Sequence, residues 1–238
     1  MQSEGKIQRD PKQKAKYGFV QFFNRFFFLL MFAGLFVLGS LLGLVFHECG
    51  HGFINVMHGG EWYRITILDP FRGTCSGTLY LTGDPYYIAR SWVLLGGALT
   101  QGIVGGVLLI SLFIPQVRKS FWASLVVLMT SIVSISSGLH NWFGTAWLVH
   151  NGYPGLDSDT TGFLWYQSQL PNGLTAMDII TTTTFLMIGT VVVFILAGSK
   201  LWRIHYPDHR FSHIWFVGLG LAVWIVHFLI KVNFFMIL

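Results

Sequence analysis

Residues 26–51 read FFFLLMFAGLFVLGSLLGLVFHECGH, an apolar run that ends in a cluster of polar side chains. A helix needs about 20 apolar residues to cross a bilayer, and this run is long enough. Its last five residues, 47–51, have the pattern H-E-x-x-H. Ionisable side chains in an apolar segment are costly and usually mark function. We therefore predict a membrane helix that carries a functional site near its carboxyl end and continues to about Met57.

The H-E-x-x-H pattern has the spacing of a metal-binding helix. Residues four apart lie on one helix face, so the imidazoles of His47 and His51 can bind the same ion. Glu48 can reach a water on that ion and act as its base. By composition alone, the pattern should occur in roughly 0.004 of chains like this one. The motif predicts a zinc hydrolase site with His47 and His51 as ligands and Glu48 as the catalytic residue.

The composition is that of a polytopic membrane protein. Hydrophobic residues make up 53% of the chain and charged residues 11%, and the mean hydropathy is +0.59, whereas soluble domains carry about 25% charged residues. The net charge of +5 does not indicate nucleic acid as a partner, because the basic residues mostly flank apolar runs. Cys49 and Cys75 cannot form a disulfide framework, although one bridge between them is possible. No cleavable signal peptide is expected, since the first apolar run is too long.

We expect an all-α polytopic fold with about five transmembrane helices. The apolar runs of sufficient length are residues 26–51, 92–114, 121–142, 179–197 and 214–235. Residues 1–25 are expected to form a basic amino-terminal segment, and residues 26–238 a single membrane domain. Between the first two spans, the composition of residues 61–82 predicts a small β-hairpin. Its open edge could pair with an extended peptide beside the site.

Lysine and arginine predict the orientation of these spans. Of the 15 basic residues, eleven precede the first span or lie between the second and third or the fourth and fifth spans, and four lie on the other side. By the positive-inside rule, the amino terminus is cytoplasmic and the carboxyl terminus is outside. This orientation places the H-E-x-x-H motif near the outer interface.

A catalytic zinc site needs a third protein ligand and an open position for water. Besides Glu48, the chain has only Glu4 and Glu61, so no downstream helix can supply a glutamate ligand. His58 comes one residue later than the metzincin pattern requires. The aspartates on the same membrane face as the motif are Asp69, Asp84, Asp157, Asp159 and Asp178.

Four sequence features follow one another between about residue 45 and residue 164. They are H-E-x-G-H at a helix end, a Gly-Gly hairpin, a glycine-bearing span and a Pro-x-Leu-Asp stretch. This segment resembles the site-2 protease (M50) family of intramembrane zinc metalloproteases, in particular its M50B-like branch. In that family an aspartate of an L-D-G motif completes the zinc site. Leu156-Asp157 matches this motif and implies Asp157 as the third ligand, but Ser158 replaces the glycine, so Asp159 is the alternative.

The resemblance implies a zinc metalloendopeptidase with one Zn²⁺ per chain. Its substrates would be membrane proteins or peptides in the lipid bilayer, not nucleic acids. Asn151 partly matches the asparagine-containing segment of the family, and Asn141 is a second amide that could bind the substrate. Glu48→Gln is expected to keep zinc and lose cleavage.

Two other classes of protein fit parts of the sequence. Membrane fatty-acid desaturases, which are diiron oxidases, can begin with a histidine box of this form and bind two irons through about eight histidines; this chain has nine. However, the chain has no H-x-x-H-H box, and the charge count places His205, His209 and His213 opposite the motif. The other class is a non-catalytic metal-binding membrane scaffold, against which the intact Glu48 argues. One zinc per chain would indicate the protease, and two irons the oxidase.

Overall fold

The computed structural model describes residues 11–69, 72–153, 158–206, 217, 218, 220–222, 224–226 and 229. In this part of the chain, four helices are long and apolar enough to cross a membrane. A small antiparallel hairpin follows the first of them. The prediction of a helical polytopic membrane protein with one hairpin is therefore confirmed. The fifth predicted span, 214–235, lies mostly outside the described residues, and those described within it are helical.

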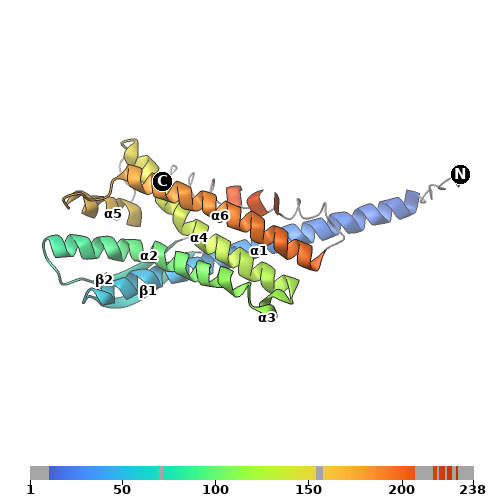
Figure 1. The fold of residues 1–238 in the computed structure, drawn as a ribbon, viewed down its shortest axis with the longest axis horizontal. Coiled ribbons are helices and arrows are strands. Elements are labelled where there is room, and N and C mark those ends of the chain that lie inside the picture. The colour runs from blue at the N-terminus through green and yellow to red at the C-terminus, as the bar shows by residue number, and fades with distance from the viewer. Residues whose placement is uncertain are drawn as a thin grey trace.

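The elements follow one another with short connections. They are α1 (Pro11–Met57), β1 (Glu61–Asp69), β2 (Arg72–Thr78), α2 (Asp84–Ser111), α3 (Pro115–Arg118), α4 (Phe121–His150), α5 (Asp159–Ser168) and α6 (Ala176–His205). The hairpin and α5 lie at one end of the bundle, and α3 lies at the other (Figure 1). We call these the hairpin end and the α3 end.

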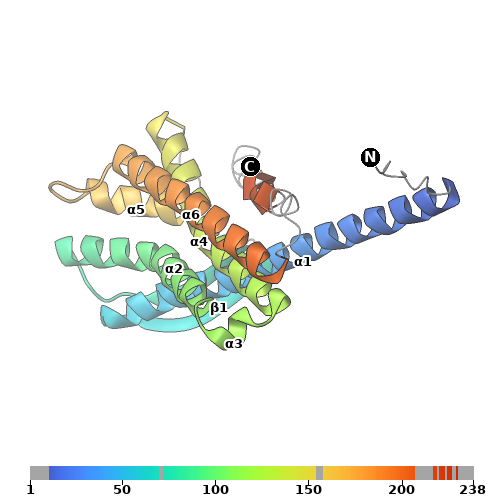
Figure 2. The same ribbon diagram turned by 45° about the vertical axis from the view of Figure 1, so that its right-hand side comes forward.

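The first helix is much longer than a membrane span. α1 has 47 residues, which corresponds to about 70 Å, against a hydrocarbon core of about 30 Å. Its amino-terminal part extends beyond the α3 end of the bundle in both views (Figures 1 and 2). The sequence predicted the span from residue 26, but the helix begins at Pro11. Proline is well suited to a first helical turn, and no proline interrupts residues 12–25.

Polar first turns also extend two other spans beyond their apolar runs. α2 begins at Asp84, not near residue 92, because Asp84 and Pro85 favour a helix amino terminus. α6 begins before residue 179 because Thr175 and Asp178 form a capping box, in which each side chain accepts a hydrogen bond from the backbone of the other.

The core is built around α4. In its apolar window 61% of the residues are buried, a larger share than in any of the other three spans. Leu125 and Leu128 of α4 are fully buried in a cluster with Phe32 of α1. A second cluster joins Trp142 of α4 to Phe163 of α5. α4 therefore holds α1, α5 and α6 in place around it.

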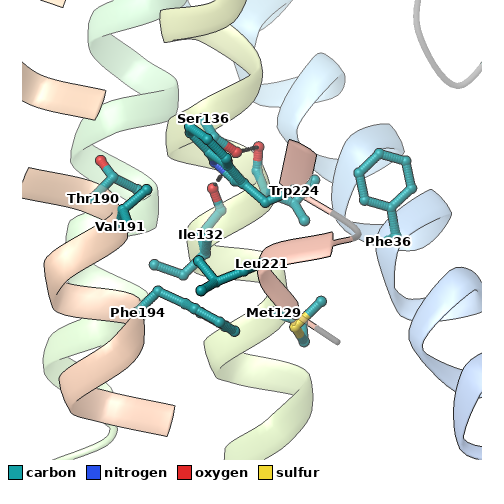
Figure 3. A pocket seen from close by; sticks show the side chains of 11 residues that line it. Phe36, Met129, Ile132, Ser136, Thr190, Val191, Phe194, Leu221 and Trp224 are labelled. Atoms are coloured by element: carbon teal, nitrogen blue, oxygen red, sulfur yellow. Dashed lines mark hydrogen bonds between the residues drawn. The ribbon is translucent and has the colours of Figure 1, made fainter. Parts of the chain in front are cut away.

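The carboxyl-terminal segment packs on the same core. Leu221 and Trp224 lie against a surface that includes Ile132 of α4 and Phe194 of α6 (Figure 3). The space left among these side chains is about 10 Å³, at the lower limit for one water molecule. The hydroxyl of Ser136 donates to the Ile132 carbonyl at 2.7 Å within its own helix (Figure 3), so it needs no partner in this space.

The hairpin packs on the carboxyl end of α1. Asn55 donates from Nδ2 to the carbonyl of Glu61 in β1 at 2.8 Å and to that of Thr78 in β2 at 2.9 Å. The indole of Trp62 lies against Gly52, where a side chain would overlap the ring. Both strands lie within residues 61–82, where the sequence predicts the hairpin. One buried amide thus joins both strands to the helix that carries the H-E-x-x-H motif.

Small residues bring α1 and α2 into close contact. A side chain at Gly50 would overlap the carbonyl of Gly96, and one at Gly96 would lie 2.7 Å from Cγ1 of Ile54. Such contacts between small residues let membrane helices pack backbone to backbone. The motif on α1 is therefore held directly against the middle of α2.

Candidate metal centre

Two imidazoles and one carboxylate converge where α1, α2 and α5 meet. Nε2 of His47 lies 2.8 Å from Oδ2 of Asp159, and Nε2 of His51 lies 3.1 Å from the same oxygen. The two rings are nearly perpendicular, with centroids 4.6 Å apart. One ligand atom from each of the three residues lies within 4.8 Å of the others, so the group could hold a metal ion.

The position of Asp159 follows from the start of α5. Ser158 is the N-cap, and its hydroxyl accepts a hydrogen bond from the backbone N–H of Thr161 at 3.3 Å. Asp159 is then the first residue of the helix, where an acidic side chain is favourable. Asp157, which the family resemblance implied as the ligand, lies outside the described residues.

Asp159 is held in its charged form. Burial alone would raise the pKa of its carboxyl group, but the positive charge of His51 and the hydrogen bonds from His47 and His51 outweigh that effect. The pKa of Asp159 is therefore well below its usual range. An ionised carboxylate next to two imidazoles is a suitable donor for a divalent cation.

The outward ring nitrogens of both histidines have partners on α2. Nδ1 of His47 lies 3.1 Å from Oε1 of Gln101, and Nδ1 of His51 lies 2.6 Å from the carbonyl of Val93. Both partners accept hydrogen bonds, so each Nδ1 carries a proton, and each ring, when it is neutral, would present a lone pair on Nε2.

The two imidazoles and the carboxylate have the chemistry of a metal site. In neutral rings, two lone pairs would each lie about 3 Å from Oδ2 of Asp159 and would repel this oxygen unless a positive charge compensates them. Protons on both imidazoles or a bound cation would supply that charge. Two nitrogen ligands and one oxygen ligand, with no fourth in the described group, match the composition of a catalytic zinc site that keeps an open position.

Gly97 and Gln101 of α2 shape the site around His47. A side chain at Gly97 would lie 2.6 Å from the His47 ring, so glycine leaves the space that this ring fills. Gln101 is only 3% exposed, which is unusual for an amide within an apolar span. Neither residue belongs to the site that the sequence predicts. Gln101 could have been found because it is a polar residue within an apolar, transmembrane run.

Glu48 lies on the hairpin side of the motif. It is 4% exposed, and a side chain at Gly73 of β2 would lie 3.0 Å from Glu48 Oε1. The carboxylate is therefore covered by the glycine of a strand. Glu48 follows His47 directly in the sequence, and its carboxylate lies at the boundary between α1 and the hairpin.

The other polar residues singled out in the sequence lie elsewhere. Asn151 caps α4, and its Nδ2 donates to the carbonyl of Trp147 at 2.8 Å. Asn141 is half-buried on α4. His205 lies at the α3 end, where its Nε2 donates to the carbonyl of Arg118 at 3.0 Å. His209 and His213 lie outside the described residues. Among the described residues, one group of three side chains lies close enough to hold a metal ion: His47, His51 and Asp159.

This combination defines a class: a polytopic membrane protein with a metallopeptidase-type His-Glu-x-x-His helix and a carboxylate beside its two histidines. Residues 25–154 match the family model Peptidase M50B-like. Since this match covers more than half of the 238 residues, the chain belongs to the Peptidase M50B-like family. No match was found to a curated protein or to a solved structure. The matched segment includes His47, Glu48 and His51 and ends before Asp159.

Proposed function

We propose that this protein is an intramembrane zinc metalloprotease that hydrolyses peptide bonds of membrane-embedded substrates. The observation that carries the proposal is the convergence of His47, His51 and Asp159 on one point, next to Glu48 and within an apolar span. Membership of the Peptidase M50B-like family supports a membrane protease.

His47, His51 and Asp159 would hold the zinc ion. Bound there, the ion would lower the pKa of a water molecule towards 7 and polarise the substrate carbonyl. Gln101 and the Val93 carbonyl keep both imidazoles in the orientation that this binding requires. Asp159 takes the role that the family resemblance implied for Asp157.

Glu48 would act as the general base and then as the general acid. It would take a proton from the attacking water and deliver that proton to the leaving amine. Its burial keeps bulk water away from the carboxylate and strengthens its interactions with nearby charges.

The substrate would bind in an extended form. Carbonyls in a helix are hydrogen-bonded and sterically covered, so a transmembrane substrate must unwind before hydrolysis. The two-stranded hairpin has open edges in the described part of the chain, and an extended segment could add to one of them. Asn141 and Asn151 remain proposed substrate-binding amides, and a cytoplasmic amino terminus remains the proposed orientation.

Metal content and cleavage should be measured on the same purified variants. Glu48→Gln is expected to keep about one zinc per chain and to reduce cleavage of a transmembrane peptide by several orders of magnitude, because the base is lost. Asp159→Ala is expected to lose both metal and cleavage.

Asp157→Ala is the matched control, since it removes a carboxylate two residues away and should keep the metal. Full proteolysis by Glu48→Gln would exclude Glu48 from the mechanism. Unchanged zinc in Asp159→Ala would show that the third ligand is wrong, and two irons per chain would indicate a diiron oxidase.

A further inference from the structure

A second cavity lies at the α3 end, remote from the metal centre. Its volume is about 310 Å³, and it is bounded by the end of α2, the start of α4 and the end of α6. The walls are mostly apolar, with Leu109 and Phe113 on one side and Leu196 and Leu201 on the other. A volume near 300 Å³ is typical of small-molecule pockets.

The cavity opens sideways, towards the region that the bilayer would occupy. Three of its apolar lining residues are highly exposed on the outside of the bundle: Ile110 (67%), Phe113 (71%) and Leu196 (65%). They belong to the ends of two candidate membrane spans or follow one directly. In a bilayer, apolar side chains so exposed on these spans would contact hydrocarbon. An acyl chain can therefore enter from the side without crossing a polar barrier.

Two cations line this same cavity. Arg118 closes α3 and Lys200 lies on α6, and Nζ of Lys200 lies 5.9 Å from the centroid of the Phe113 ring. Every carboxylate in the described residues belongs to the metal centre, the hairpin or the helix starts at the hairpin end. In the described part of the chain, no acidic side chain at the α3 end offsets these two charges.

We propose that this cavity binds an anionic phospholipid. One acyl chain would fill the apolar part, and the headgroup phosphate would bind Arg118 and Lys200. A guanidinium can donate two hydrogen bonds to a phosphate, and basic pockets between membrane helices bind anionic headgroups in this way. The net charge of the headgroup decides the selectivity, because a choline group cancels the phosphate charge that the two cations attract. The proposal does not depend on the function of the metal centre.

Native mass spectrometry of the full chain tests the headgroup. Phosphatidylglycerol and phosphatidylcholine with identical acyl chains would be added separately to the detergent-purified protein. The wild-type chain is expected to retain phosphatidylglycerol at least about fivefold better. Lys200→Gln and Arg118→Gln should each reduce that retention by about fivefold. Arg203→Gln is the matched control: Arg203 is exposed on α6 three residues after Lys200 and does not line the cavity.

A second pair of variants tests the acyl site. Ala197→Phe fills the cavity from α6 and should reduce the retention of both lipids, whereas Val192→Phe places the same ring on an exposed part of α6 outside the cavity. Equal retention of the two lipids by the wild-type chain would overturn the proposal. So would an equal loss in Arg203→Gln and Lys200→Gln, or unchanged retention in Ala197→Phe.

Discussion

At the scale of single residues, the candidate metal centre depends on residues that are not among its three proposed ligands. Gln101 accepts the Nδ1 proton of His47 and so fixes which ring nitrogen faces Asp159. A hydrogen-bond acceptor on the far side of a metal-bound imidazole typically changes metal affinity by 10–100-fold. The neighbouring residues in the span are apolar or small, so Gln101 has no substitute nearby.

Gln101→Leu is therefore expected to weaken zinc binding by about 10–100-fold, measured by titration against a competing chelator. Gln101→Glu should restore most of the affinity, because a carboxylate accepts the same hydrogen bond. A purely structural role for Gln101 predicts that both variants lose affinity alike. Equal zinc affinity in wild type and Gln101→Leu would remove the residue from the site.

Gly97 allows a second residue-scale prediction. Gly97→Ala places a methyl group 2.6 Å from the His47 ring, so the ring must move and zinc affinity should fall at least about tenfold. Gly102→Ala on the same helix is the control, because a side chain there meets no atom within 4 Å. It should leave zinc affinity unchanged and stabilise α2 by up to about 1 kcal/mol. A similar loss in both variants would point to a general effect of alanine on α2.

The residues of the site differ in how far the sequence could predict them. His47, Glu48 and His51 follow from helical spacing, which is a local property. The third ligand, a carboxylate, depends on where α5 begins, and the Ser158 cap fixes that start two residues after the aspartate that the family motif suggested. Gln101 joins the site only through the contact between α1 and α2, and no local pattern shows that contact.

At the scale of elements, the position of the hairpin depends on one helix residue. Asn55 bonds to both strands, and Cys75, on one of them, is half-buried. Burial, together with the negative charge of Glu48, raises the pKa of the Cys75 thiol to about 11. Thiolate is the reactive form, so near pH 8 this cysteine should react with iodoacetamide on the order of a hundredfold more slowly than a free thiol.

Asn55→Ala is expected to release the hairpin and speed the labelling of Cys75. The measurement needs a Cys49→Ser background, so that one thiol is followed by mass spectrometry. Raising the pH towards 11 should speed labelling in the parent protein as the thiolate forms. If Asn55→Ala labels no faster than the parent, the amide does not hold the strands.

The elements themselves were largely predictable, but their ends were not. Apolar length identified the spans that became α1, α2, α4 and α6. Their starts depend on short local signals, such as Pro11 in the first turn of α1 and the capping box that Thr175 and Asp178 form at the start of α6. A count of apolar residues does not register these signals, so the predicted helices were too short.

At the scale of the whole molecule, a bound metal would tie α1 to α5 across the bundle. A ligand that binds only the folded state stabilises it by about 2.7 kcal/mol at a concentration one hundred times its dissociation constant. Removing zinc with a chelator is therefore expected to lower the melting temperature in detergent by about 5–10 °C. Asp159→Ala should melt at the same temperature with and without chelator. A chelator effect of equal size in that variant would place the ion elsewhere.

The histidines and the aspartate of the proposed centre are also synthesised at different times. His51 leaves the ribosome 108 residues before Asp159, and α2 and α4 must enter the membrane in between. During that interval the nascent chain has an incomplete coordination shell. A partly synthesised chain would thus be unable to cleave neighbouring proteins in the translocation machinery, and hydrolytic competence would arise only once α5 has joined the bundle.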